Sequence, residues 1–164
     1  MVLRPASDAD FPFLYALYAS TRASEMALVD WTEQQKEEFL HMQFNAQHQF
    51  YHEHFASASF DVIEIDGSAV GRLYVDRRER EIRIIDIALM PDQRGKGIGS
   101  ELIRELIDEA SASDRSVGIH VEHNNPALSL YRRLGFAHVH DEGVYYFMRW
   151  QQASQHEAQE NTAS

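Results

Sequence analysis

The spacing of apolar residues predicts two helices in the first third of the chain. The first is indicated by apolar residues at helical intervals, namely Phe11, Leu14, Tyr15, Leu17 and Tyr18. Ser7 or Asp8 can cap this helix, and we expect it to end at Thr21. A second helix is expected from about Thr32 to His54, because Thr32 can cap it and acidic residues fill its first turn.

The second helix carries two further features. Its aromatic residues are Phe39, Phe44, Phe50, Tyr51 and Phe55. The simplest interpretation is that they form its core-facing side, and a substrate or dimer surface is the alternative. His48 and His52 have the i, i+4 spacing of a metal-ligand pair. No motif supplies a third ligand, and histidines on the wet face of a polar helix are the simpler explanation, so we expect no metal.

Strands are predicted before and after these helices. Residues 2–5 read as a short opening strand. Residues 60–65 and 70–75 are strand-like, and the Asp66-Gly67 turn between them predicts a hairpin. A charged turn is expected at 76–80. Residues 82–90 are apolar except for an arginine and an aspartate, which is typical of a central strand buried on both faces.

The rest of the chain continues the alternation of helix and strand. Pro91 ends the strand, and a helix is expected over 100–110, with an apolar stripe formed by Leu102, Ile103, Leu106, Ile107 and Ala110. A strand over 117–122 precedes a helix capped by Asn125 and ended by Gly135. Residues 144–150 form the last strand. We therefore expect one domain over residues 1–150 and a polar, flexible tail over 151–164.

Composition excludes several classes of function. The chain has 164 residues, no cysteine and a formal charge of -11, so disulfides, thiolate metal sites and a cysteine nucleophile are excluded. The charge disfavours nucleic acid and favours a cationic partner, although solubility is its simplest explanation. Because no apolar run would span a membrane and the N-terminus lacks an apolar export segment, we expect a cytoplasmic protein.

A glycine-rich turn between a strand and a helix is the main candidate for binding chemistry. Free N–H groups at the start of a helix attract anions, and glycine lets a phosphate approach the backbone. Arg94 and Lys96 add positive charge there. The phosphate loop of nucleotide triphosphatases is absent, and the spacing differs from the dinucleotide fingerprint. A plain structural turn is the alternative.

Two motifs resemble those of the GNAT acetyltransferases. Gln93-Arg94-Gly95-Lys96-Gly97-Ile98-Gly99 resembles the family signature Q/R-x-x-G-x-G/A, and residues 87–91 are similar to its fourth strand and terminating proline. Residues 121–136 are similar to its N-x-x-A-x-x-L-Y-x-x-L-G-F segment. The matches there are Asn124, Ala127, Leu130, Tyr131, Gly135 and Phe136. The resemblance covers roughly residues 60–150.

The resemblance implies both a fold and a cofactor. The fold would be α/β, with a mixed sheet of six to seven strands, helices on both faces, and fourth and fifth strands that splay apart. The cofactor would be acetyl-CoA, with pantetheine paired to the backbone of Ile87, Ala88, Leu89 and Met90. An N–H near Leu89 would polarise the thioester carbonyl. The remaining cofactor contacts would come from Arg94, Gly95, Lys96, Gly97, Ile98, Gly99, Ser100, Asn124, Asn125 and Tyr131.

The implied reaction is direct attack of a neutral primary amine on the thioester in a ternary complex. The attack needs a base to take the proton of the ammonium form and an acid to protonate the leaving sulfur. Tyr131 matches the family's acid position, and a core aromatic is the alternative interpretation.

Three residues are candidates for the base. Asp86 is the only acid within the predicted buried strand, and an isolated buried carboxylate is costly. An ion pair with Arg72 or Arg83 is its alternative role. His120 and Glu122 alternate with apolar residues, so both face the same side of the fifth strand.

Two other functions are kept as alternatives. One is a non-catalytic CoA-binding or interaction module, and the other is an acyltransferase for a longer acyl-CoA. The acceptor amine stays unidentified, although Glu25 lies in the region that usually shapes the acceptor pocket in this family. We expect no membrane or nucleic-acid partner, and a homodimer is left open.

Overall fold

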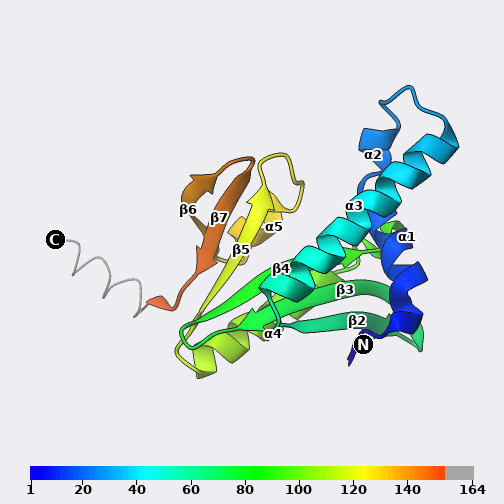
Figure 1. Ribbon diagram of the computed structural model, residues 1–164. Coiled ribbons are helices and arrows are strands. Elements are labelled where there is room, and N and C mark those ends of the chain that lie inside the picture. Colours follow the sequence, from blue (N-terminus) through cyan, green and yellow to red (C-terminus); the bar gives the residue numbers. More distant parts are fainter. Residues whose placement is uncertain (154–164) are drawn as a thin grey trace. The chain divides into compact units, whose positions relative to one another are not determined.

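The computed structural model describes residues 1–153, which contain seven strands, five α-helices and two short 3-10 helices (Figure 1). In chain order the elements are β1 Val2–Pro5, η1 Asp8–Asp10, α1 Phe11–Thr21, α2 Ala23–Met26, α3 Glu33–His54, β2 Ser59–Ile65, β3 Ser68–Arg77, β4 Glu81–Leu89, η2 Pro91–Gln93, α4 Ile98–Ala112, β5 Ser116–Glu122, α5 Leu128–Arg133, β6 Ala137–Glu142 and β7 Tyr145–Trp150. No helix within these residues is long and apolar enough to cross a membrane.

The seven strands form one sheet in the order β1-β2-β3-β4-β5-β7-β6. β4 and β5 run parallel, whereas β1–β2, β5–β7 and β6–β7 are antiparallel pairs. The predicted α/β fold with a mixed sheet is therefore confirmed. The chain divides into two compact units, the first of Met1–Tyr74 and Asp86–Arg94, the second of Val75–Ile85 and the residues from Gly95 onward.

The first unit is built around helices α1 and α3, which pack on the sheet at β2 (Figure 1). Its core consists of Leu14, Tyr18, Leu40, Phe44 and Val62. Both predicted helices are confirmed at their C-terminal ends. Thr32 caps α3 as expected, since its side chain accepts a hydrogen bond from the N–H of Gln35 at 3.1 Å.

Only part of the aromatic side of α3 is core. Phe44 is buried, whereas Phe50 is 49% exposed. The predicted hairpin is confirmed, because Asp66 and Gly67 have φ values of 52° and 80° and connect β2 to β3. Two positive φ values in a two-residue loop identify the type I′ turn that favours Asp-Gly.

In the second unit, α4 packs on β5 (Figure 1). The apolar stripe of α4 faces this contact, and Leu102, Ile103, Leu106 and Ala110 are all buried. β5 pairs in parallel with the first half of β4, from Glu81 opposite Ser116 to Ile84 opposite Ile119. On its other edge β5 pairs with β7 along its length.

Three predicted helix starts need correction. Ser7 caps the 3-10 helix η1, and α1 follows from Phe11 with Asp10 as its N-cap. α4 begins at Ile98 instead of Ser100, because Gly97, with a φ of 85°, is already its N-cap. α5 begins at Leu128, later than the cap predicted at Asn125. The Asn125 side chain instead accepts a hydrogen bond from the N–H of Ala127 at 2.9 Å, which closes a turn before the helix.

Other predictions were incomplete. β6 was missed because all six of its residues are exposed, and its apolar alternation is limited to Ala137 and Val139. The short helix α2 was also missed, and the charged turn is shorter than predicted because β3 continues to Arg77. β4 is only half-buried from Ile85 onward, so burial on both faces is wrong for its second half. Residues 154–164 of the predicted tail lie outside the described residues, whereas Gln152 donates a hydrogen bond to the Ser111 carbonyl at 2.7 Å.

Candidate functional site

The glycine-rich turn joins η2 to α4 and has two residues with left-handed backbone. Gly95 and Gly97 have φ values of 75° and 85°, which strain any residue with a side chain. Gly99 differs, because it lies in the first turn of α4 without a positive φ, and an added Cβ would meet no protein atom within 4 Å. The polypeptide therefore does not require glycine at 99, and a small residue there leaves the space beside the helix start open to an anion.

The start of α4 offers several N–H donors. The first N–H that bonds back to the turn is that of Glu101, which donates to the Gly97 carbonyl at 3.0 Å. The N–H groups of Ile98, Gly99 and Ser100 therefore belong to the helix end that has no intrahelical acceptors. Lys96 is exposed in the same turn. Because these donors and the helix dipole point the same way, the turn can hold an anion such as a pyrophosphate.

The second half of β4 presents alternate backbone groups to its two edges. The Met90 N–H donates to the Val70 carbonyl on β3 at 2.8 Å. A Cβ on Gly71 of β3 would clash with the Ala88 carbonyl oxygen, so residues 88 and 90 both point their polar groups at β3. By strand alternation, the N–H groups of Ile87 and Leu89 point to the other edge. The Leu89 carbonyl accepts a hydrogen bond from Arg94 Nε at 3.1 Å.

Asp86 is held in an ion pair with Arg72. Arg72 Nε donates to Asp86 Oδ2 at 2.5 Å, and its Nη2 contacts the same oxygen. The buried guanidinium also donates to Gln47 Oε1 at 2.8 Å and lies 4.8 Å from the centre of the Tyr74 ring. Burial alone would lower the pKa of Arg72, but the Asp86 carboxylate more than compensates, and the pKa is raised. The structure therefore supports the structural role considered for Asp86.

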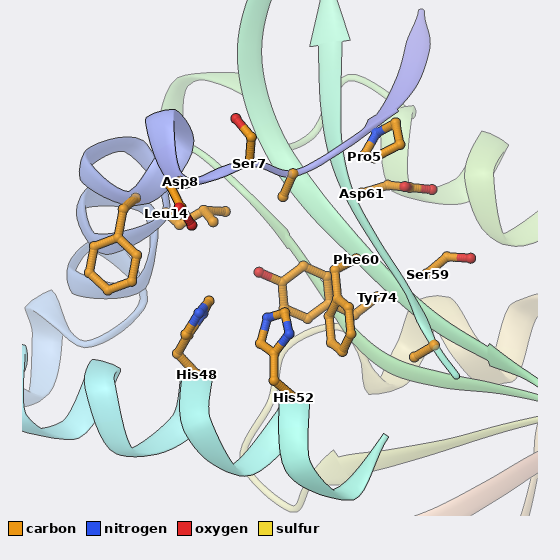
Figure 2. A pocket seen from close by; sticks show the side chains of 13 residues that line it. Pro5, Ser7, Asp8, Leu14, His48, His52, Ser59, Phe60, Asp61 and Tyr74 are labelled. Atoms are coloured by element: carbon orange, nitrogen blue, oxygen red, sulfur yellow. The ribbon is translucent and has the colours of Figure 1, made fainter. Parts of the chain in front are cut away.

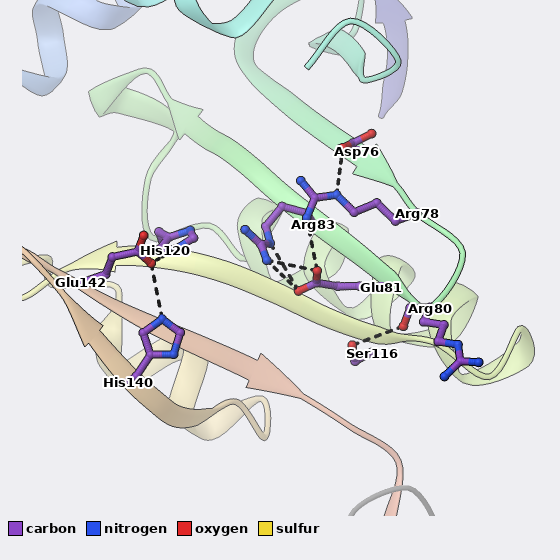
Figure 3. A network of polar contacts seen from close by, with 9 residues as sticks. All are labelled: Asp76, Arg78, Arg80, Glu81, Arg83, Ser116, His120, His140 and Glu142. Carbon is purple, nitrogen blue, oxygen red and sulfur yellow. Dashed lines mark hydrogen bonds and ion pairs between the residues drawn. The ribbon is translucent and has the colours of Figure 1, made fainter. Parts of the chain in front are cut away.

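Arg83 takes no part in that pair. It bonds to Glu81, with Nη2 at 3.1 Å from the carboxylate, and Glu81 also contacts Arg78, which in turn bonds to Asp76 (Figure 3). Glu81 lies over Gly118 of β5, where an added Cβ would be 3.1 Å from its Cδ. The ion pairs of this network link β3, the turn after it and β4, and Glu81 packs against β5 at Gly118.

His120 lies on β5 and contacts a carboxylate that the sequence did not suggest. Its Nε2 is 2.8 Å from Glu142 Oε2, and His140 Nε2 approaches the same oxygen at 3.4 Å (Figure 3). The bond to His120 and the second contact with His140 lower the pKa of Glu142. Glu142 therefore stays ionised near neutral pH. Glu142 was missed because β6 was missed, and only the pairing of β6 with β7 brings it to His120.

Two other predicted residues of the second unit have defined surroundings. Tyr131 on α5 is buried, and its ring packs edge-on against Phe136 with centroids 5.7 Å apart. The turn at Gly135, with a φ of 100°, returns the chain so that the Phe136 N–H bonds to the Tyr131 carbonyl at 3.0 Å. Glu122 is half-buried and lies opposite Tyr145 of β7.

The remaining candidate site residues lie in the turn after β5 and on α2. Asn124 and Asn125 are exposed in the turn between β5 and α5. Glu25 pairs with Arg22 at 3.1 Å on α2 and is more than half exposed. Within residues 1–153, no group of three or more histidine, cysteine, aspartate or glutamate side chains is arranged to hold a metal ion.

Comparison with known proteins gives a consistent set of matches. The model of the acetyltransferase (GNAT) family matches residues 20–136. The chain is 35% identical over 91 residues to a putative [ribosomal protein bS18]-alanine N-acetyltransferase of Bacillus subtilis, a match covering 52% of this chain and 60% of that protein. It is 32% identical over 107 residues to the N-alpha-acetyltransferase RimI of Mycobacterium tuberculosis, covering 63% of this chain and 64% of that one. The match thus spans less than two thirds of either relative.

A solved structure is similar over nearly the whole chain. It is the PaiA N-acetyltransferase from Thermoplasma acidophilum in complex with coenzyme A, with a TM-score of 0.69 and 16% sequence identity. The similarity covers 92% of this chain and 98% of that one. At this identity the likeness concerns the fold.

Proposed function

Because the chain belongs to the acetyltransferase (GNAT) family, we propose that it transfers the acetyl group of acetyl-CoA to a primary amine by direct attack in a ternary complex. The observation that carries the proposal is the start of α4. The N–H groups of Ile98, Gly99 and Ser100 belong to a helix end without intrahelical acceptors, and Gly99 leaves the space beside them free of a side chain. A phosphate seated there would accept hydrogen bonds from these groups.

Three sets of residues in the chain would bind the cofactor. The N–H groups from Gly95 to Ser100 would hold the pyrophosphate beside Arg94, whose own N–H bonds to the Pro91 carbonyl. Pantetheine would lie along Ile87, Ala88, Leu89 and Met90. The N–H groups of Ile87 and Leu89 face it, whereas the polar groups of Ala88 and Met90 face β3. Asn124, Asn125 and Tyr131 would supply the remaining contacts with the cofactor. Bound acetyl-CoA supplies the activated thioester. The Leu89 N–H, which faces away from β3, donates to the thioester carbonyl and stabilises the charge that grows on its oxygen.

His120 is our choice for the general base. An ionised carboxylate only accepts hydrogen bonds, so the short contact with Glu142 requires that His120 Nε2 carry the proton. Nδ1 is then the nitrogen that can take a proton from the ammonium of the acceptor. Asp86 is less suited because Arg72 holds it, and Glu122 is kept as the alternative base.

Tyr131 is the proposed general acid. Its hydroxyl would protonate the sulfur of the departing CoA, while its ring packs on Phe136. Packing and catalysis are compatible, since they use opposite ends of the side chain.

The proposed acceptor is a cationic amine. The formal charge of -11 favours such an acceptor over an anionic one. A second candidate acceptor is the amino group of a protein N-terminus, because the Bacillus subtilis relative is named for an alanine of a ribosomal protein.

The Gly99→Val variant tests the cofactor assignment. Valine is larger than the alanine that the family signature also accepts at this position, and its Cβ meets no protein atom within 4 Å, so the melting temperature should change little. Acetyl-CoA affinity measured by calorimetry should nevertheless fall at least about tenfold, or about 1.4 kcal/mol.

The exposed Glu105→Val change on the same helix is the matched control, and it should leave the affinity unchanged. Equal affinity of the Gly99→Val variant and the wild type would remove the α4 start from the cofactor site.

A further inference from the structure

Helix α3 has an outward side that the core of the first unit does not use. Its inward side contributes Phe44 to the core, and Figure 2 shows His48 and His52 projecting from α3 toward Phe60 and Tyr74. The opposite side of the helix is therefore the one that faces solvent. With 22 residues, α3 is about 33 Å long, so this side is an extended surface.

Five exposed residues at four-residue intervals form a ridge on the outward side. They are Glu38, Met42, Ala46, Phe50 and His54, and we call them the α3 ridge. Met42 is 58% exposed and Phe50 is 49% exposed. Residues four apart are neighbours on a helix surface, so these side chains follow one another in this order. The ridge therefore has an apolar centre between an acidic end and a histidine end.

A hollow lies beside the N-terminal half of the α3 ridge. It has a volume of about 340 Å³ and is lined by Trp31, Gln35, Glu38, Phe39 and Met42. The rings of Trp31 and Phe39 meet edge-on, with centroids 5.3 Å apart. Because two aromatic rings and a methionine supply most of the lining, the hollow suits an apolar side chain that comes from another molecule.

The α3 ridge is complementary to its own reverse. When two copies of α3 lie antiparallel with the two Ala46 residues facing each other, Met42 lies opposite Phe50 of the second copy, and Glu38 lies opposite its His54. Helices pack through rows of residues spaced by four, and the small side chain of Ala46 lets the two helices approach closely at the centre. Phe50 of each copy then lies beside the hollow of the other.

Charge favours the antiparallel orientation over the parallel one. The first turn of α3 contains Glu33, and its last turn contains His52 and His54. An antiparallel pair places the acidic end of each helix beside the histidine end of the other, and it also sets the two helix dipoles in opposite directions. A parallel pair would place Glu38 beside Glu38, where like charges repel.

We propose that the α3 ridge and the hollow beside it form the interface of a homodimer, in which two copies of α3 pack antiparallel about Ala46. The Phe50 ring of each copy fills the hollow of the other. The interface is symmetric, because each copy contributes both a ridge and a hollow. The dimer does not depend on the proposed transferase activity, since it uses no residue assigned to the cofactor or to proton transfer.

Sedimentation equilibrium of the full chain tests the association. Between about 1 and 200 µM the chain should show a reversible monomer–dimer equilibrium. The salt concentration is 0.15 M, because the formal charge of -11 on each copy opposes association and is then screened over about 8 Å.

A matched pair of variants tests the apolar centre of the ridge. Met42→Glu places a charge opposite Phe50 of the second copy and should raise the dissociation constant at least about tenfold, with an unchanged helix content. Val144→Glu makes a similar change at a residue of the β6–β7 turn that is 65% exposed, and it should leave the association unchanged.

Single cysteines test the orientation, because the chain has none of its own. Ala46→Cys should form an intermolecular disulfide on mild oxidation, since the two positions face each other. Glu53→Cys lies seven residues further along the same side of α3. Its two thiols would be about 21 Å apart in the antiparallel pair but adjacent in a parallel one, so it should stay unlinked.

Three results would overturn the proposal. They are a wild-type chain that stays monomeric up to about 200 µM, a Met42→Glu variant that associates as tightly as the wild type, and a Glu53→Cys variant that links as readily as Ala46→Cys. The mass of the wild type and the pair of cysteine variants decide the question even if Met42→Glu folds poorly.

Discussion

Glu142 and His120 show how a single contact can select among candidate residues. From the sequence, three residues were candidates for the general base, and the sequence did not distinguish between them. The 2.8 Å contact with Glu142 fixes which nitrogen of His120 carries the proton, whereas Asp86 is already held by Arg72. The pairing of Asp86 with Arg72 was one of the alternatives considered from the sequence, whereas the contact of His120 with Glu142 was not, because it depends on the missed strand β6.

Replacing Glu142 with glutamine tests its role as a positioning residue. The amide keeps the shape, but it can donate as well as accept a hydrogen bond, so it no longer requires the proton to be on His120 Nε2. We expect kcat to fall about tenfold and the melting temperature to change little. His120→Gln should cost at least about a hundredfold. A Glu142→Gln variant with the kcat of the wild type would mean that Glu142 plays no part in the reaction.

Tyr131→Phe tests the general acid. The variant keeps the ring that packs on Phe136 and loses only the hydroxyl, so folding and acetyl-CoA affinity should change little. Turnover should fall about a hundredfold or more. Tyr15→Phe on α1, where the ring stacks on His41, is the control and should retain full activity. Full activity of Tyr131→Phe would leave Tyr131 with a packing role alone.

At the scale of elements, one ion-pair network ties β1, η1 and β2 together. Arg4 donates to both carboxylate oxygens of Asp10 at 2.7 and 2.8 Å and to Glu64 at 2.7 Å. The bond from Arg4, followed by the N–H of Ser7, holds the pKa of Asp10 well below its usual range. The network therefore fastens the start of α1 to the edge of the sheet.

The lowered pKa of Asp10 makes stability depend on pH in a definite direction. A carboxyl with a depressed pKa in the folded state stabilises the protein above its unfolded value, which is about 4. That contribution is lost as the pH falls below this value toward the folded pKa. We expect Asp10→Asn to lower the melting temperature at pH 7, and the difference from wild type to shrink below about pH 4. A constant difference across this range would contradict the linkage.

The elements that could be predicted are those with a local signal. The Thr32 cap, the Asp66-Gly67 turn and the apolar stripe of α4 each depend on neighbours along the chain, and the structure confirms them. β6 had no such signal, since all its residues are exposed and it is held by pairing with β7. The glycine turn of the candidate site was predictable from spacing, but not the start of α4 at Ile98.

At the scale of the whole molecule, the fold and the family are established, but neither of them identifies the acceptor amine. The formal charge of -11 should draw in ammonium-bearing acceptors, and salt should weaken that attraction because charges are screened over about 10 Å at 0.1 M. The single domain over 1–150, the gap between the fourth and fifth strands and the cytoplasmic location stay predictions.

Release of CoA thiol, with mass detection of the acetylated amine, tests the central claim most directly. The full chain is incubated with acetyl-CoA and, in turn, a polyamine, a peptide with a free N-terminal alanine, and an acidic amino acid. Thiol release should require both acetyl-CoA and an amine, be fastest with the polyamine at low salt, and fall at least about a hundredfold in His120→Gln. Tight binding of acetyl-CoA without acetylation of any amine would contradict the account and leave a CoA-binding module in place of an enzyme.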